Sequence, residues 1–413
     1  MEVLRSKNNE SSPNTSITTK ERASNPKWAY VFLLADVNPE EPSYQGILYN
    51  IFVSTYVLKH DPTAQSYSKA DIVVMVQMSS ASKESKLREE SFLQRMGIKI
   101  LYLEPPTATT TISTKQEDTT TTFYSLVLAK FHVLKLTTYT KVLFLDGDVL
   151  TLCNLDYLLA LSEEGQVLKE TVLHAMYEDP VNAGLFIVTP KQEYYDEVQD
   201  IIQRHGIPSK QENNSNWDPK VGWGDKSVDY RLWDMTPGKG WSFYCADADQ
   251  GLLLYWARFV RKQVSIIVGP VIEEYSPSNY DGAPEQVTSS GALLEHSCVE
   301  RDLQKHGRTG TFAANAGPMA ASLPFYQDFF HMVGYSKAWE LPPVRPVPNS
   351  RDEVESSSEY WYFLLQKVKD RFDSEKIIPP IEEITKSIPQ PRIRGDLISV
   401  ADGPDGDLVP VVV

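Results

Sequence analysis

The chain has 413 residues, of which 41% are hydrophobic and 23% charged, so it carries enough apolar side chains for a sizeable globular core. Its formal net charge is -15 and its pI is near 5.0. A nucleic-acid binder needs a basic surface, and this balance argues against DNA or RNA as the main partner.

The cysteines and the N-terminal segment bear on the compartment. Cys153, Cys245 and Cys298 are far apart and odd in number, so we expect neither a disulfide framework nor a zinc site, which favours a reducing compartment. No apolar run approaches the roughly 18 residues that span a bilayer, and the N-terminus lacks the apolar segment of a signal peptide. We therefore expect a cytoplasmic protein with no membrane span in this chain. The alternative is a Golgi-lumen protein whose N-terminal anchor is missing from this chain.

Apolar runs alternate with amphipathic segments along most of the chain. Residues 1–26 are polar, and we expect them to be disordered. The apolar runs predict strands over Ala29–Leu34, Ile72–Val76, Ile98–Leu103, Lys141–Leu145 and Gly184–Val188. The amphipathic segments predict helices over Gln45–Lys59, Ser85–Met96, Ser125–Leu136, from Thr189 to about Arg204, from Asp249 onward and over Ser357–Phe372. This alternation predicts an α/β domain over residues 27–345, with a mostly parallel sheet covered by helices on both faces.

Two long stretches interrupt the pattern. Residues 206–244 are polar and contain several tryptophans, and residues 275–323 are rich in Gly, Ser, Ala and Pro. Insertions of this length are usually functional or disordered. A C-terminal helix within residues 346–373 and an extended or disordered tail over 374–413 complete the predicted organisation.

The strongest chemical signal is the segment KVLFLDGDVL over residues 141–150. A buried strand there delivers Asp146 and Asp148 to its carboxyl end, where open α/β sheets bind their ligands. Two carboxylates one residue apart can share a hard divalent cation. Two alternatives fit the same letters: an Asp-Gly turn that ends a strand, and a haloacid-dehalogenase-type phosphatase with the first aspartate as nucleophile. Such phosphatases usually open their fold with this motif, whereas several elements precede it here.

Four segments in order resemble the signature blocks of glycosyltransferase family 8, the glycogenin-like family. They are LAKFHVLKLTTYTKVLFLDGDVLTLCNLDYLL (128–159), VNAGLFIVTP (181–190), DADQGLLLYW (247–256) and HMVGYSKAWE (331–340). The resemblance covers roughly Trp28 to Glu340. It implies a GT-A fold, in which one Rossmann-like domain binds a nucleotide-diphospho-sugar, and a Mn²⁺-dependent transfer with retained anomeric configuration, usually from a UDP-sugar.

The resemblance also implies a metal site. Asp146 and Asp148 match the family's Asp-x-Asp, which holds Mn²⁺ and touches the donor ribose, and His331 matches its third metal ligand. An imidazole beside two carboxylates suits Mn²⁺ better than Mg²⁺. A lone histidine is more often a core residue, but the spacing H-x-x-G-x-x-K-x-W around His331 favours the ligand.

Further matches imply donor-binding residues along the chain. Gly334 and Lys337 correspond to the diphosphate-binding residues, where glycine allows close approach and lysine offsets charge on the departing UDP. Lys130 corresponds to a donor-contacting lysine, and Asn182 to an asparagine that reaches the donor sugar. For both lysines the alternative is an ordinary surface side chain.

The block DADQGLLLYW matches the residues next to the transferring sugar. Asp249 is the candidate catalytic carboxylate and Gln250 a donor-binding residue, although Asp249 could also be a plain helix N-cap. At the other end of the resemblance, Asn38 and Tyr44 follow the first strand, where the family binds uracil and ribose.

We therefore expect a retaining hexosyltransferase that moves glucose or galactose from a UDP-sugar to an unidentified carbohydrate, protein or small-molecule acceptor. Two other hypotheses are a self-glycosylating primer, for which Tyr275 and Tyr280 are possible acceptors, and a binding protein with an inactive site. In the insertion 206–244, Trp223 and Trp233 are candidate acceptor contacts, since aromatic faces suit sugar rings. The alternative is that these rings pin the loop to the domain.

Overall fold

The computed structural model describes a core of the chain together with several shorter segments. These are residues 27–62, 64–104, 126–152, 154–163, 168–175, 180–205, 218–224, 240–241, 243, 245–268, 287–289, 329–331, 337–340, 347, 357–373, 376–380, 383–384, 400–402 and 408–410. The expectations for residues 1–26, for the insertion 275–323 apart from 287–289, and for most of 206–244 and of the tail 374–413 lie outside these ranges.

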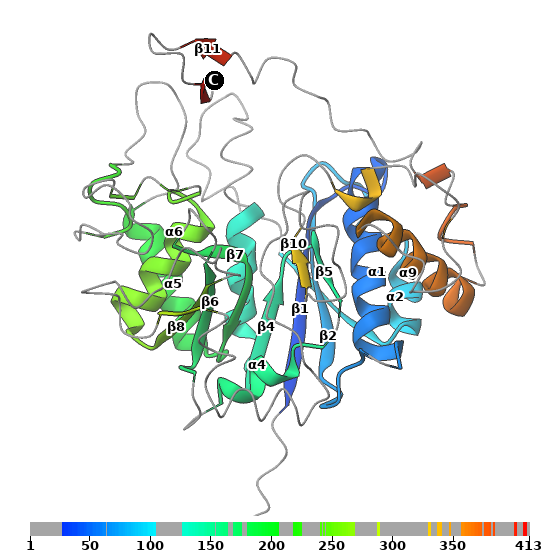
Figure 1. Ribbon diagram of the computed structural model, residues 1–413, viewed down its shortest axis with the longest axis horizontal. Coiled ribbons are helices and arrows are strands. Elements are labelled where there is room, and N and C mark those ends of the chain that lie inside the picture. The colour runs from blue at the N-terminus through cyan, green and yellow to red at the C-terminus, as the bar shows by residue number, and fades with distance from the viewer. Residues whose placement is uncertain are drawn as a thin grey trace, which may run out of the picture.

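Eight strands form one sheet in the order β3-β2-β1-β4-β7-β6-β8-β9 (Figure 1). Their bounds are β1 Trp28–Val37, β2 Asp71–Met78, β3 Ile98–Leu103, β4 Lys141–Leu145, β6 Thr171–Ala175, β7 Asn182–Val188, β8 Val264–Val268 and β9 Val287–Ser289. Two pairs lie apart from this sheet: β5 (Val149–Thr151) with β10 (Phe329–His331), and β11 (Val400–Asp402) with β12 (Leu408–Pro410).

Within the large sheet, β7 alone runs against the other strands. It pairs antiparallel with β4 on one side and with β6 on the other, and the remaining neighbours pair in parallel. The predicted mostly parallel sheet is therefore confirmed. The first residue of β7 consequently lies at the edge where the parallel strands end, which matters for the site.

Both faces of the sheet are buried, because successive side chains of a strand point to opposite faces. On β1, Tyr30 and Phe32 enter one core, and Val31 and Leu33 enter the other. The first face is covered by α1 (Gln45–His60), α2 (Glu90–Arg95), α4 (Asp156–Leu161) and α9 (Ser357–Phe372). The second is covered by η2 (Ala129–Lys135), α5 (Gln192–His205), α6 (Asp249–Leu254) and the π-helical η3 (Tyr255–Arg261). The 3-10 turns η1 (Pro42–Tyr44) and η7 (Ala338–Glu340) flank the first face.

The helix α1 is buried around most of its circumference, whereas the amphipathic pattern predicted one buried face, because α9 covers part of the side that would otherwise face water. One side faces the sheet, and α9 packs beside it on the same face (Figure 1). The C-terminal helix thus shares its core with the sheet, although it lies beyond the segment that carries the family resemblance.

The helix predicted over Ser85–Met96 is shorter in the structure, where α2 starts only at Glu90. Ser82 Oγ bonds both the N–H and the carbonyl of Glu84, and the N–H of Leu87 donates to the Tyr102 hydroxyl. These bonds hold the preceding residues in turns, since local side-chain partners compete with helical ones.

The helix predicted over Ser125–Leu136 is largely the 3-10 helix η2. The predicted C-terminal helix is α9. No helix within the described ranges is long and apolar enough to cross a membrane.

Candidate active site

The strand β4 carries Asp146 and Asp148 to the carboxyl edge of the sheet. The N–H of Asp146 bonds Gly184 O at 2.8 Å, and its carbonyl accepts the N–H of Val149 at 2.9 Å, which closes a tight turn. The predicted Asp-Gly turn and the carboxylate pair are therefore one feature. The two side chains are 29% and 22% exposed, so both can reach a ligand.

Asn182 joins this edge because β7 runs antiparallel. Leu145 pairs with Leu185 across the two strands, which puts the start of β7 beside the end of β4. The Asn182 side chain is buried, and its Oδ1 accepts the N–H of Gly184 at 2.8 Å. The structure thus places Asn182 beside Asp146.

A buried lysine links the first aspartate to the start of α6. Lys130, on η2, is 3% exposed, and its ammonium group forms ion pairs with Asp249 and, at 3.2 Å, with Asp146. It also donates to Ala183 O at 3.3 Å. Burial alone would lower the pKa of Lys130, but the negative charges of Asp146 and Asp249 outweigh it and raise the pKa. Lys130 is thus not the ordinary surface lysine of the alternative interpretation.

Asp249 is the first residue of α6 rather than its cap. Ala248 occupies the N-cap position, where no side chain makes a capping hydrogen bond, and the Asp249 carboxylate binds Lys130 instead. Gln250 follows it and is 4% exposed. Gly251 packs so tightly that an added Cβ would lie 1.7 Å from Ala246 O, which explains a glycine at this position of the block.

Lys337 and His331 approach Asp148 from the C-terminal part of the chain. The Lys337 ammonium forms an ion pair with Asp148, although 189 positions separate the two residues. In the β10–β5 ladder, His331 pairs with Val149, so its backbone lies directly across from the residue that follows Asp148. Gly334 and the side chain of His331 lie outside the described part of the structure.

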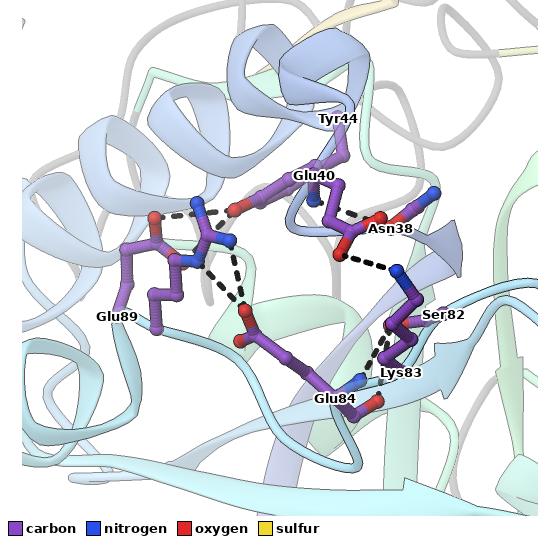
Figure 2. Close-up of polar contacts among 8 residues, drawn as sticks. Asn38, Glu40, Tyr44, Ser82, Lys83, Glu84 and Glu89 are labelled. Atoms are coloured by element: carbon purple, nitrogen blue, oxygen red, sulfur yellow. Dashed lines mark hydrogen bonds and ion pairs between the residues drawn. The ribbon is translucent and has the colours of Figure 1, made fainter.

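The segment after β1 is held by a chain of polar contacts, which Figure 2 shows. Asn38 caps its own turn, with Oδ1 accepting the N–H of Glu40 at 3.1 Å. Tyr44 is 6% exposed, and its hydroxyl donates to Glu89 at 3.2 Å. Burial raises the pKa of the Glu89 carboxyl. The structure therefore ties Tyr44 into the core beneath this segment, and contact of Asn38 and Tyr44 with a donor stays a prediction.

Trp223 is fully buried. Its indole N–H donates to Ala246 O at 2.8 Å, three residues before Asp249. In this arrangement Trp223 fixes the loop that leads into α6. This agrees with the alternative hypothesis, in which the aromatic rings of the insertion attach the loop to the domain. Trp233, the other acceptor candidate, lies outside the described residues.

The carboxylates fit a divalent cation by their chemistry. Oxygen ligands from Asp146 and Asp148 suit Mg²⁺ and Mn²⁺, and an imidazole from His331 would add the nitrogen that favours the softer ion. Among the side chains that the structure describes, no three His, Cys, Asp or Glu form a metal-ligand cluster. The described cations near the pair are the ammonium groups of Lys130 and Lys337.

One residue of this site escaped the sequence analysis. Asn50, on α1, is fully buried and hydrogen-bonds the carbonyls on both sides of Asp148. Its signal in the sequence is an amide between the apolar residues Tyr49 and Ile51 of a predicted helix, a position where a buried polar group needs partners.

Residues 46–212 match the family Glycosyl transferase family 8. Glycogenin-1 of Caenorhabditis elegans is 29% identical over 130 residues, which cover 29% of this chain and 28% of that protein. The match thus spans little more than a quarter of this curated relative.

Solved glycosyltransferase structures are similar at low identity. GlyE of Streptococcus pneumoniae has 14% identity and a TM-score of 0.36, over 89% of this chain and 66% of that one. The galactosyltransferase LgtC, solved with donor and acceptor sugar analogues, has 14% identity and a TM-score of 0.34, over 82% of this chain and 95% of that one. The family match and the sheet topology agree with the expected GT-A class of α/β fold.

Proposed function

We propose that this chain, whose residues 46–212 belong to glycosyl transferase family 8, is a metal-dependent glycosyltransferase. It moves a hexose, glucose or galactose, from a UDP-sugar to an acceptor hydroxyl. The proposal rests on a cluster of ion pairs at one edge of the sheet. Lys130 pairs with Asp146 and Asp249, and Lys337 pairs with Asp148. These charges come from segments far apart in the sequence, and a purely structural pair of aspartates would not need them.

The charge balance of this cluster suits a nucleotide diphosphate. Three carboxylates face two ammonium groups, so the cluster carries one net negative charge. A divalent cation held by Asp146 and Asp148, with His331 as a third ligand, would reverse that sign and act as a Lewis acid toward the diphosphate. An acidic protein can thus present a locally cationic site to an anionic donor.

The residues then have distinct roles in the transfer. Lys337, together with the backbone at Gly334, offsets the charge that develops on the departing UDP. In this proposal Asn182 and Gln250 contact the sugar, and Lys130 contacts the donor and orients Asp249, with which it forms an ion pair. The acceptor oxygen forms its bond to the anomeric carbon on the face that UDP leaves, and its proton passes to the departing diphosphate. In the alternative route the Asp249 carboxylate displaces UDP from the anomeric carbon, and the acceptor oxygen then displaces Asp249 and gives its proton to the released UDP; both routes retain configuration.

A second candidate function is self-glycosylation, which the match to Glycogenin-1 favours. In that case the acceptor would be a tyrosine of this chain, and incubation with the donor alone would add hexose units of mass to the intact protein. If the mass of the protein stays unchanged while sugar is transferred to an added acceptor, self-glycosylation is excluded and the protein acts only on a separate acceptor. The family match favours either function over a phosphatase.

The test is a donor panel with matched variants. We expect the full-length protein to release UDP from UDP-glucose or UDP-galactose with Mn²⁺, and to stop when the metal is chelated. Asp146→Asn and Asp148→Asn should each lower this rate by at least about 100-fold, because they remove charge that the metal needs, without changing the circular dichroism spectrum. Either variant releasing UDP at the wild-type rate would contradict the site. No release from any UDP-sugar in the panel would contradict the proposed donor class.

A further inference from the structure

Asn50 lies at the centre of a buried hydrogen-bond network that reaches the Asp-Gly-Asp turn. Its side-chain Nδ2 donates to Gly147 O at 2.9 Å and to Val149 O at 3.0 Å, the two carbonyls that flank Asp148. An amide nitrogen has two N–H groups, so both donors are used on this one turn. Ser54, one helical turn later, adds a hydrogen bond to Val149 O at 3.3 Å.

The Asp-Gly-Asp turn also packs directly against α1. An added Cβ at Gly147 would lie 2.2 Å from Cγ2 of Ile47 and 3.3 Å from the backbone carbonyl oxygen of Leu33, so a larger residue would force the turn and α1 apart. The glycine between the two aspartates is therefore required by the contact with α1. This contact brings Asn50 within reach of the turn and fixes how deep the turn sits.

The C-terminal helix occupies the remaining polar atom of Asn50. Trp361, on α9, donates its indole N–H to Asn50 Oδ1 at 3.1 Å, and both residues are fully buried. Asn50 thus has each of its polar atoms bonded, two contacts toward the turn and one toward α9. The indole bond fixes the orientation of the amide, because it selects the oxygen for α9 and the nitrogen for the turn.

The α9 helix also contacts the segment that carries Lys337, the ion-pair partner of Asp148. The Tyr362 hydroxyl donates to Trp339 O at 3.3 Å, two residues after Lys337. Trp339 in turn covers Gly46 on α1, where an added Cβ would lie 2.3 Å from the indole nitrogen. The α9 helix therefore contacts the segment that carries Lys337 directly, and it is linked to the turn that carries Asp148 through Asn50.

We propose that Asn50 is a positioning residue for Asp148 and that α9, through Trp361, holds Asn50 in the orientation that this requires. The C-terminal helix is then part of the metal- and donor-binding machinery. The inference rests on the proposed function, since it treats Asp148 as a residue that binds the metal and donor.

The variants isolate the amide nitrogen and the indole separately. Asn50→Asp keeps the acceptor for Trp361 and removes the two donors to the turn, whereas Trp361→Phe removes the indole donor and keeps an aromatic ring. A matched control on the same helix is Thr55→Val, because Thr55 is buried and its hydroxyl has no hydrogen-bond partner in the structure. A second control is Ser66→Ala, which breaks buried hydrogen bonds to Asp156, away from the site.

The readouts are Mn²⁺-dependent UDP binding by calorimetry and the melting temperature without metal. We expect Asn50→Asp to weaken UDP binding by about 10- to 100-fold, the range typical of residues that orient metal ligands. Trp361→Phe should weaken it several-fold, and Thr55→Val not at all. Ser66→Ala should lower the melting temperature and leave the dissociation constant unchanged.

Three outcomes would overturn the inference. If the Asn50→Asp variant has a lower melting temperature but binds UDP as tightly as the wild type does, Asn50 has only a structural role. If Asn50→Asp does not fold, Trp361→Phe decides, and unchanged binding in that variant refutes the link through α9. A wild-type protein that binds no UDP with Mn²⁺ would refute the proposed function itself, and the positioning role with it.

Discussion

At the residue scale, two buried lysines show how partners decide the state of a charge. Lys130 and Lys141 are each 3% exposed. Lys130 has Asp146 and Asp249 as partners and keeps its proton. Lys141, the first residue of β4, donates to the carbonyl of Glu170 at 3.0 Å, and burial lowers its pKa to about 8, against the weaker attraction of Glu163 and Glu170. A carbonyl satisfies the hydrogen bond of an ammonium group but does not neutralise its charge.

This difference predicts a pH dependence of stability. Between about pH 8 and the ordinary lysine pKa of 10.5, the unfolded chain holds a proton at position 141 that the folded protein has released, so folding gains stability from this group as the pH rises. Relative to Lys141→Met, the wild type should therefore gain about 2 kcal/mol in free energy of unfolding between pH 7 and pH 10. Urea unfolding at several pH values measures this.

The control for that series is Lys99→Met. Asp71 raises the pKa of Lys99, so both states keep this proton below pH 10 and the difference from wild type should stay constant there. Curves for Lys141→Met and wild type that run parallel over the same range would show that Lys141 is solvated in the folded protein.

At the element scale, the sequence predicted the long, locally patterned elements and missed the short ones. Unbroken apolar runs marked β1, β2, β3, β4 and β7, since a strand buried on both faces is apolar throughout. The strands β5 and β10 were missed because three residues carry little pattern, and β6 (TVLHA) and β8 (VSIIV) were missed because a polar residue interrupts each short apolar run. The residues of the candidate site were likewise predicted only in part. Motifs pointed to Asp146, Asp148, Lys130 and Lys337, which the structure brings together, whereas the role of Asn50 depends on a contact with α9.

Tight packing fixes the position of the backbone at the start of α6. Trp223 holds Ala246 O, and Gly251 accommodates that carbonyl at close range, so the backbone before Asp249 has little freedom. Trp223→Phe should leave a buried carbonyl without its donor and lower stability by about 1–3 kcal/mol. We expect kcat to fall and the KM values for donor and acceptor to change together, because the whole loop shifts. Steady-state kinetics and thermal melts measure both.

Trp256→Phe is the matched control for that prediction. Its indole N–H donates to Glu197 at 3.1 Å from η3, the continuation of the same helical run, on the side facing α5. It should lower the melting temperature to a similar extent and leave turnover intact. A Trp223→Phe variant with normal stability and only a raised acceptor KM would restore the acceptor contact that the sequence suggested.

At the scale of the whole molecule, the folded unit extends past the segment that resembles the family. The core around α1 takes in Tyr360, Trp361, Tyr362, Phe363, Leu364, Leu365 and Val368 from α9. Seven such side chains, at roughly 1.5–3 kcal/mol each for full burial, contribute about as much as the net stability of a typical domain. A boundary drawn after residue 345 on the sequence pattern alone would therefore cut through the core.

A chain that ends after residue 345 is accordingly predicted not to fold. Without α9, the outer side of α1 would face water, and the Asn50 amide oxygen would lose the indole donor of Trp361. We expect the truncated protein to lose its cooperative thermal transition and its near-ultraviolet circular dichroism, since a core lacking this cover cannot pack specifically. The control ends after residue 384, which keeps α9 together with Ile378 and Ile384 of the same core and removes β11 and β12, which pair with each other. That control should melt within a few degrees of the full chain. Cooperative melting of the shorter chain at the wild-type temperature would show that α9 is an appendage, and the link from α9 to Asp148 would then fail as well.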